Sequence, residues 1–184
     1  MNRFAAILFS FCLLLFASAA HAQVPTSGNI FFGYSFYSTD LSTIDRANTN
    51  GWEGSLEGKV FPFLGIVADF DGHYGSQNFP GLCGGEACQI NLNATEHNVL
   101  FGPRVSASVG RFRPFGEVLV GVGHVSLNNG GGSDTSFASA FGGGLDYKVV
   151  KPIALRLQGD YVNTRFFDRT QNNLRLSTGI VFRF

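Results

Sequence analysis

Hydrophobic and polar residues alternate along the last thirteen positions of the chain, 172–184. The even-numbered positions are occupied by Leu174, Leu176, Thr178, Ile180, Phe182 and Phe184. The odd-numbered positions are occupied by Arg175, Ser177, Gly179, Val181 and Arg183. Because side chains alternate between the two faces of a β-strand, this segment is predicted to be a strand with one apolar face and one face that carries two arginines.

The same two-residue period recurs in seven earlier segments. Their approximate bounds are 29–38, 51–60, 64–74, 97–105, 115–126, 136–148 and 153–166. In the second of them, Trp52 and Leu56 alternate with Glu53 and Glu57. Together with 172–184, these segments predict an all-β chain of eight strands.

The connections between the predicted strands differ in length. Three are short and lie at 61–63, 106–114 and 149–152. The other four are mostly longer, are rich in Gly, Asn, Asp, Ser and Thr, and lie at 39–50, 75–96, 127–135 and 167–171. Short turns at one end and longer polar loops at the other are typical of membrane barrels. We therefore predict an eight-stranded antiparallel up-and-down transmembrane β-barrel.

Aromatic residues gather near both ends of the predicted strands. At the short-turn end they are Phe61, Phe63, Phe115, Tyr147, Phe182 and Phe184. At the long-loop end they are Trp52, Tyr74, Phe137, Tyr161 and Phe166. Two such belts predict the aromatic girdles that flank the lipid-facing band of a membrane barrel.

The start of the chain has the layout of a cleavable secretory signal. Arg3 is followed by an apolar run at 4–16 and by the small-residue site Ala20-His21-Ala22. This order of a basic, an apolar and a cleavage region predicts that residues 1–22 are a signal peptide and that 23–184 form the barrel domain.

Charge and composition exclude one class of partner. Removing Arg3 with the signal leaves 12 basic against 13 acidic residues. A nearly neutral domain has no electrostatic basis for binding nucleic acid. The 24 glycines and 20 phenylalanines agree with strands and turns rather than with helices.

Charged residues fall on the strand faces that are not apolar. They are Glu53, Glu57, Lys59, Asp69, Asp71, Arg104, Glu117, Asp146, Arg156, Asp160, Arg175 and Arg183. Seven are acidic and five basic, so they can pair across the interior. Because an eight-stranded barrel is only wide enough for side chains to fill it, we predict a lumen plugged by this charge network. A narrow path for ions or small solutes, gated by the same charges, is the alternative.

The signal peptide, the eight segments and the terminal Phe184 together resemble the small eight-stranded outer-membrane β-barrels of Gram-negative bacteria, the OmpA/OmpX-like group. Within that group, Phe141–Lys148 and Ile153–Tyr161 resemble the closing hairpin of the OmpA-like β-barrel domain. The resemblance implies a place in the outer membrane, contact with membrane lipids and lipopolysaccharide, and a structural or surface-interaction role. It also implies that Phe184 is an assembly signal for the outer-membrane insertion machinery.

One pair of residues suggests an enzyme. His124 and Ser126 resemble the catalytic dyad of lipid A deacylase barrels, in which histidine activates serine for ester hydrolysis. The longer motif of that family is not matched, because Leu127 follows the serine. We therefore predict a protein that is not an enzyme, with the lipid-modifying hydrolase as an alternative. His73 and His97 give no metal-ligand spacing, so no cofactor or metal site is predicted.

The longest connection, 75–96, contains Cys83 and Cys88, which are the only cysteines after the signal. Exported proteins meet oxidising conditions, so these cysteines are predicted to form a disulfide. Loops displayed on a rigid scaffold are where binding residues concentrate. We therefore expect this loop to contact a surface ligand.

Overall fold

The computed structural model describes residues 27–39, 47–83, 86–128 and 132–184, with the side chains of residue 47 and of 77–92 left out of that description. Its elements are β1 (Gly28–Thr39), β2 (Ala47–Phe61), β3 (Leu64–Cys83), β4 (Glu86–Ser106), β5 (Phe112–Leu127), β6 (Gly132–Lys148), β7 (Ile153–Thr164), the 3-10 turn η1 (Phe166–Asp168) and β8 (Gln171–Arg183). Within the described ranges, no helix is both long and apolar enough to cross a membrane.

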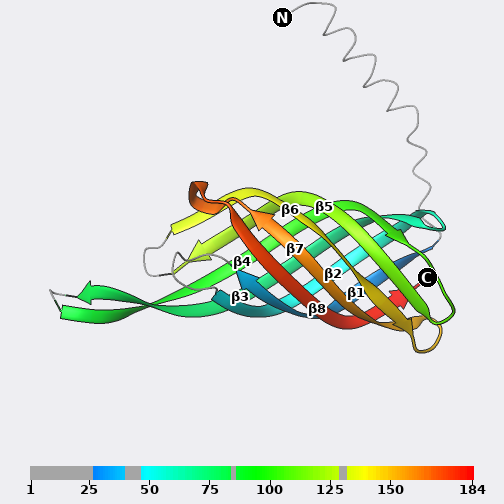
Figure 1. Cartoon of the computed structure of the whole chain (residues 1–184), viewed down its shortest axis with the longest axis horizontal. Coiled ribbons are helices and arrows are strands. Elements are labelled where there is room, and N and C mark those ends of the chain that lie inside the picture. Colours follow the sequence, from blue (N-terminus) through cyan, green and yellow to red (C-terminus); the bar gives the residue numbers. More distant parts are fainter. Residues whose placement is uncertain (1–26, 40–46, 84–85, 129–131) are drawn as a thin grey trace, which may run out of the picture.

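The strands form one closed barrel in which each pairs antiparallel with its neighbours in the sequence (Figure 1). β8 closes the barrel against β1, with Phe32 opposite Ile180 and Gly33 opposite Gly179. Closure leaves no unpaired sheet edge within the barrel wall, which is the condition for a sheet to span a membrane. The predicted fold class is confirmed.

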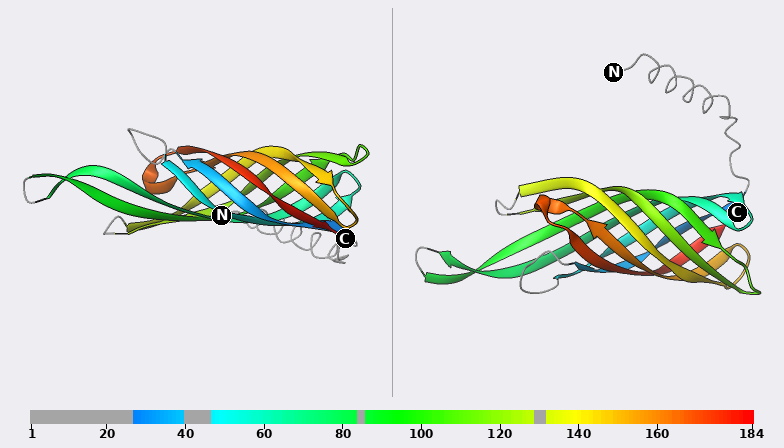
Figure 2. Two further views of the ribbon diagram at one scale, coloured as in Figure 1. Left: turned by 90° about the horizontal axis from the view of Figure 1, so that it is seen from below. Right: turned by 45° about the horizontal axis from the view of Figure 1, so that its top comes forward.

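The connection between β3 and β4 differs from the prediction. The long loop expected at 75–96 is a hairpin that continues both strands, with Gly75 opposite Ala94 and Cys83 opposite Glu86. It projects beyond the barrel, at the end away from the C-terminus (Figures 1 and 2). The sequence pattern missed it because a ribbon that projects beyond the barrel needs no apolar face toward lipid, so its sequence is not required to alternate apolar and polar residues.

The outer surface of the barrel is apolar. Large hydrophobic side chains on this face are well exposed, among them Phe32 (65%), Phe137 (62%) and Leu157 (66%). The charged side chains of the same strands are buried inside, for example Glu53 and Arg175 (both 0%). Soluble monomers rarely expose so large an apolar surface, whereas a lipid-facing barrel requires it.

Two aromatic residues that we assigned to the girdles lie inside the barrel instead. Phe115 is 8% exposed and Phe166 is 1% exposed. Phe115 shares its strand parity with Glu117, so the alternation already places it on the inner face. Phe166 follows the end of β7 and belongs to η1. The assignment of both to a girdle was wrong, because it used position along the strand and ignored the face.

Candidate functional site

Arg175 lies at the centre of the barrel interior and contacts four carboxylates. Its Nη1 lies 2.7 Å from Asp69 Oδ1 and 2.6 Å from Asp71 Oδ2. Its Nη2 lies 2.9 Å from Asp160 Oδ2, and its Nε lies 3.4 Å from Glu53 Oε2. The planar guanidinium presents five N–H donors, which is why one arginine can bind acids from β2, β3 and β7 at once.

A second ion-pair cluster lies nearer the short-turn end. Arg104 Nη2 lies 2.6 Å from Glu117 Oε2, and Arg104 Nη1 lies 3.3 Å from Glu57 Oε2. Lys59 Nζ lies 2.5 Å from Glu57 Oε1 and donates a hydrogen bond of 2.7 Å to Ser106 Oγ. Glu57 therefore links the cations of β2 and β4.

A third cluster joins β6, β7 and β8. Arg156 Nε lies 2.7 Å from Asp146 Oδ1, and Arg183 Nη2 lies 3.2 Å from Asp146 Oδ2. The side chain of Arg183 keeps 22% of its surface exposed, so this cluster opens toward the barrel end. With it, each of the twelve charged residues named from the sequence lies inside the barrel and has at least one ion pair.

Neutral side chains connect these clusters, and none of them is predicted from the sequence as a site residue. The amide nitrogen Nε2 of Gln158, which has two hydrogens to donate, lies within hydrogen-bonding distance of Glu53 Oε1 (3.0 Å), Glu117 Oε1 (2.9 Å) and Asp160 Oδ2 (2.8 Å). Asn98 Nδ2 donates to an oxygen of Asp71 at 2.8 Å. Buried carboxylates need such donors, because an unsatisfied polar group inside a protein is costly.

Toward the long-loop end the interior network continues through Tyr37. Its hydroxyl donates to Glu96 Oε1 (3.1 Å) and accepts a hydrogen bond from Asn173 Nδ2 (2.9 Å). Its ring stacks on His73 with ring centroids 4.4 Å apart, and a ring nitrogen of His73 lies 2.9 Å from Ser35 Oγ.

The misassigned Phe115 takes part in the lumen packing. The guanidinium carbons of Arg104 and Arg156 each lie 4.5 Å from the centroid of its ring. Cation–π attraction is strongest where water is excluded, as it is here. Gly144 faces this ring, and a Cβ placed on it would lie 2.8 Å from Phe115 Cζ. The absent side chain of Gly144 therefore leaves the space that the phenyl ring fills.

One part of the interior is apolar. It is formed by Tyr37, Val67, Leu100, Leu119, Ala138, Ala140 and Val162, all 1% exposed or less. The ion pairs and this apolar cluster both lie buried in the barrel interior. The lumen is thus plugged, as predicted, but by hydrophobic packing as well as by charges.

His124 and Ser126 lie on the outer face of β5, away from the plug. They continue the even-numbered series of β5, in which Val118, Val120 and Val122 are exposed on the outer face. His124 Nδ1 lies 2.7 Å from Thr135 Oγ1. Asp134 holds the η1 turn, because its Oδ2 accepts a hydrogen bond of 2.5 Å from the backbone N–H of Phe167. The arrangement is therefore a polar group on the outer wall of the barrel, next to a hollow that Asp134, Thr135 and Arg165 help to line.

The cysteine pair lies on the projecting hairpin. The backbone register places Cys88 opposite Gly81 and Cys83 opposite Glu86, so the two cysteines are diagonal neighbours along the paired backbones. Their side chains lie outside the description, and the disulfide stays a prediction. In the described part of the chain, no group of three or more His, Cys, Asp and Glu residues is arranged to hold a metal ion.

Comparison with known proteins gives matches in structure only. No protein-family model and no curated protein sequence matches the chain. Neisserial surface protein A (NspA) matches with a TM-score of 0.65 and 12% identity, over 85% of this chain and 97% of that one. Ail, the attachment invasion locus protein of Yersinia pestis, solved in complex with the heparin analogue sucrose octasulfate, matches with a TM-score of 0.56 and 16% identity, over 86% of this chain and 98% of that one. The chain therefore has the fold of the small eight-stranded outer-membrane β-barrels, in agreement with the OmpA/OmpX-like resemblance of its sequence.

Proposed function

We propose that this chain is an integral outer-membrane protein of a Gram-negative bacterium, with a structural or surface-interaction role and no catalytic activity. One observation carries the proposal: an exposed apolar outer wall surrounds an interior of buried, paired charges. This is the reverse of a soluble protein and is the arrangement that lipid requires. Residues 1–22 act as the export signal in this proposal, and the Cys83–Cys88 disulfide forms after export.

The proposal is tested by electrophoresis in detergent and by solute permeation. A closed barrel resists detergent until it is heated, so unboiled and boiled samples are expected to migrate differently. Liposomes that contain the folded protein are expected to swell in small solutes at the rate of protein-free liposomes, because the lumen is filled. Identical mobility of the unboiled and boiled samples would contradict a closed barrel. Rapid swelling of the liposomes would establish the channel alternative.

The projecting β3–β4 hairpin is the proposed contact surface for an external partner. It extends farther from the barrel than the other described strands at that end (Figure 2). The Ail structure holds a sulfated sugar analogue, which shows that a barrel of this fold can bind a ligand. Binding residues are expected on such projecting segments, because they are displayed while the barrel stays rigid.

The hydrolase alternative makes a separate prediction. If His124 and Ser126 do not act as a dyad, wild-type protein and Ser126→Ala are expected to leave lipid A equally unchanged, as measured by mass spectrometry of the lipid. Loss of acyl chains with the wild type but not with Ser126→Ala would establish the enzyme. Ser139→Ala, at a serine of β6, is the control for an unspecific effect of removing a hydroxyl.

Deleting Phe184 is expected to lower the amount of protein in the outer membrane several-fold, and to impair assembly more than it impairs the finished fold. The backbone of Phe184 makes two hydrogen bonds with Gly28, of 2.9 and 3.1 Å, and its side chain is 57% exposed. Losing two such bonds costs about 1–3 kcal/mol of unfolding free energy. Membrane fractionation measures the first effect and urea unfolding the second. The control is Phe184→Tyr, which keeps an aromatic end and is expected to assemble normally. Normal membrane levels of the deletion variant would contradict the assembly role of Phe184.

A further inference from the structure

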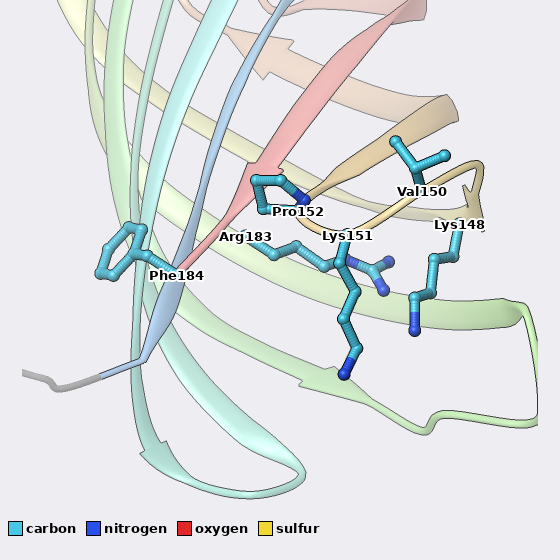
Figure 3. Close-up of a pocket in the computed structure, with 6 residues that line it drawn as sticks. All are labelled: Lys148, Val150, Lys151, Pro152, Arg183 and Phe184. Carbon is cyan, nitrogen blue, oxygen red and sulfur yellow. The ribbon is translucent and has the colours of Figure 1, made fainter.

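A hollow at the short-turn end of the barrel is lined by three basic side chains. Lys148 comes from the end of β6, Lys151 from the turn that follows, and Arg183 from the end of β8. Figure 3 shows these side chains together with the other lining residues, Val150, Pro152 and Phe184. The volume is about 320 Å³. We call this set of six residues the basic pocket.

The charge of the basic pocket is only partly compensated. None of the six lining side chains is acidic, but Phe184 is the last residue of the sequence and adds its α-carboxylate to the pocket. The nearest described side-chain carboxylate partner is Asp146, which lies 3.2 Å from Arg183 but also binds Arg156 at 2.7 Å. Lys148 and Lys151 therefore add positive charge to a site where the one buried acid is already shared. An anion in the pocket would be attracted electrostatically by both lysines.

Two lining residues of the basic pocket are apolar and exposed. Val150 is 55% exposed and Phe184 is 57% exposed. Phe184 also lines a second, apolar hollow of about 490 Å³ on β2 and β3, together with Leu56 and Val60. Lysines placed next to exposed apolar residues can extend their ammonium groups to the level of lipid headgroups. A free inorganic anion would use the cations but would leave these apolar residues uncovered.

We propose that the basic pocket binds the phosphate-bearing headgroup of an anionic phospholipid in the periplasmic leaflet of the outer membrane. This inference rests on the proposed function, because the short-turn end, which carries the C-terminus, is the periplasmic end of such a barrel (Figure 1). Basic side chains near a membrane surface each contribute about 1 kcal/mol to the attraction of anionic lipid. That corresponds to about fivefold in affinity for each lysine.

The experiment is native mass spectrometry of the protein in neutral detergent, titrated with phosphatidylglycerol or with phosphatidylethanolamine of the same acyl chains. Wild-type protein is expected to bind the anionic lipid more tightly than the zwitterionic one. The double variant Lys148→Gln/Lys151→Gln is expected to lose affinity for phosphatidylglycerol by about fivefold per residue, with little change for phosphatidylethanolamine. Arg183 is left unchanged because it is part of the ion-pair plug.

The matched control is Arg165→Gln/Arg169→Gln, which removes two exposed cations at the opposite end of the barrel. It is expected to keep wild-type selectivity, and an equal loss would mean that net charge alone governs binding and would overturn the proposal. Equal binding of both lipids by the wild type would overturn it as well. Displacement of phosphatidylglycerol by excess inorganic phosphate would assign the pocket to a free anion instead. A heat-dependent mobility shift, measured on the same samples, separates failure of this site from failure of the proposed function.

Discussion

Replacing Arg175 by methionine is expected to destabilise the folded barrel by about 3–5 kcal/mol, the usual cost of removing one partner from a buried ion pair. Asp69, Asp71, Asp160 and Glu53 would then share the interior without the guanidinium that contacts all four. Their mutual repulsion acts in a medium that screens charge poorly, so the effect is expected to exceed that of losing a single surface pair. The loss of unfolding free energy is measured by urea unfolding of the refolded protein, with the heat-dependent mobility shift as the readout of the folded fraction.

Two further variants separate charge from geometry at Arg175. Arg175→Lys keeps the charge, but an ammonium group cannot match the forked contacts, so its unfolding free energy is expected to lie between those of wild type and Arg175→Met. Adding Asp160→Asn to Arg175→Met removes one of the uncompensated acids and is expected to recover part of the stability. Arg169→Met, at an exposed arginine, is the control and is expected to lose about 0.5 kcal/mol or less. An Arg175→Met protein as stable as this control would contradict the plug.

The two-residue period of the sequence was sufficient to predict the eight strands of the barrel wall and to place the charged residues on the inner face, but it missed the extension of β3 and β4 beyond the barrel. It could not predict which charges pair. Arg175 lies 106 residues from Asp69 and 15 from Asp160 in the sequence, and it reaches both. Which side chains meet across a lumen depends on strand tilt and stagger, and these are set by the closure of the whole barrel.

Other features were missed because they depend on chemistry rather than on periodicity. Gln158 contacts three carboxylates, but an amide on an inner face gives no signal that it will bridge charges. Phe115 was assigned by its place near a strand end, although its parity with Glu117 indicated the lumen. Applying parity first would have found it, whereas the two arginines against its ring could be found only from the structure.

Placing an arginine on the outer wall at mid-strand provides the sharpest test of which face meets lipid. Val120 lies in the middle of β5, opposite Phe101 of β4 and Ser139 of β6, and its side chain is 40% exposed. Val120→Arg is expected to cost about 2–4 kcal/mol of unfolding free energy in lipid vesicles, because a guanidinium near the bilayer midplane must be desolvated or must distort the bilayer.

The depth dependence of this cost distinguishes lipid from simple overpacking. Val109, in the short turn before β5, is 68% exposed, and Val109→Arg is expected to cost at most about 1 kcal/mol, because it lies near the interface. Val120→Leu changes size without charge and is expected to be nearly neutral, since lipid accommodates its extra methylene. If the outer wall faced water or a protein partner, the unfolding free energy lost in each arginine variant would not depend on its depth in the bilayer. Equal unfolding free energies for Val120→Arg and Val109→Arg would therefore contradict a membrane-spanning barrel, whereas a difference of about 2 kcal/mol would place the apolar wall in the hydrocarbon layer.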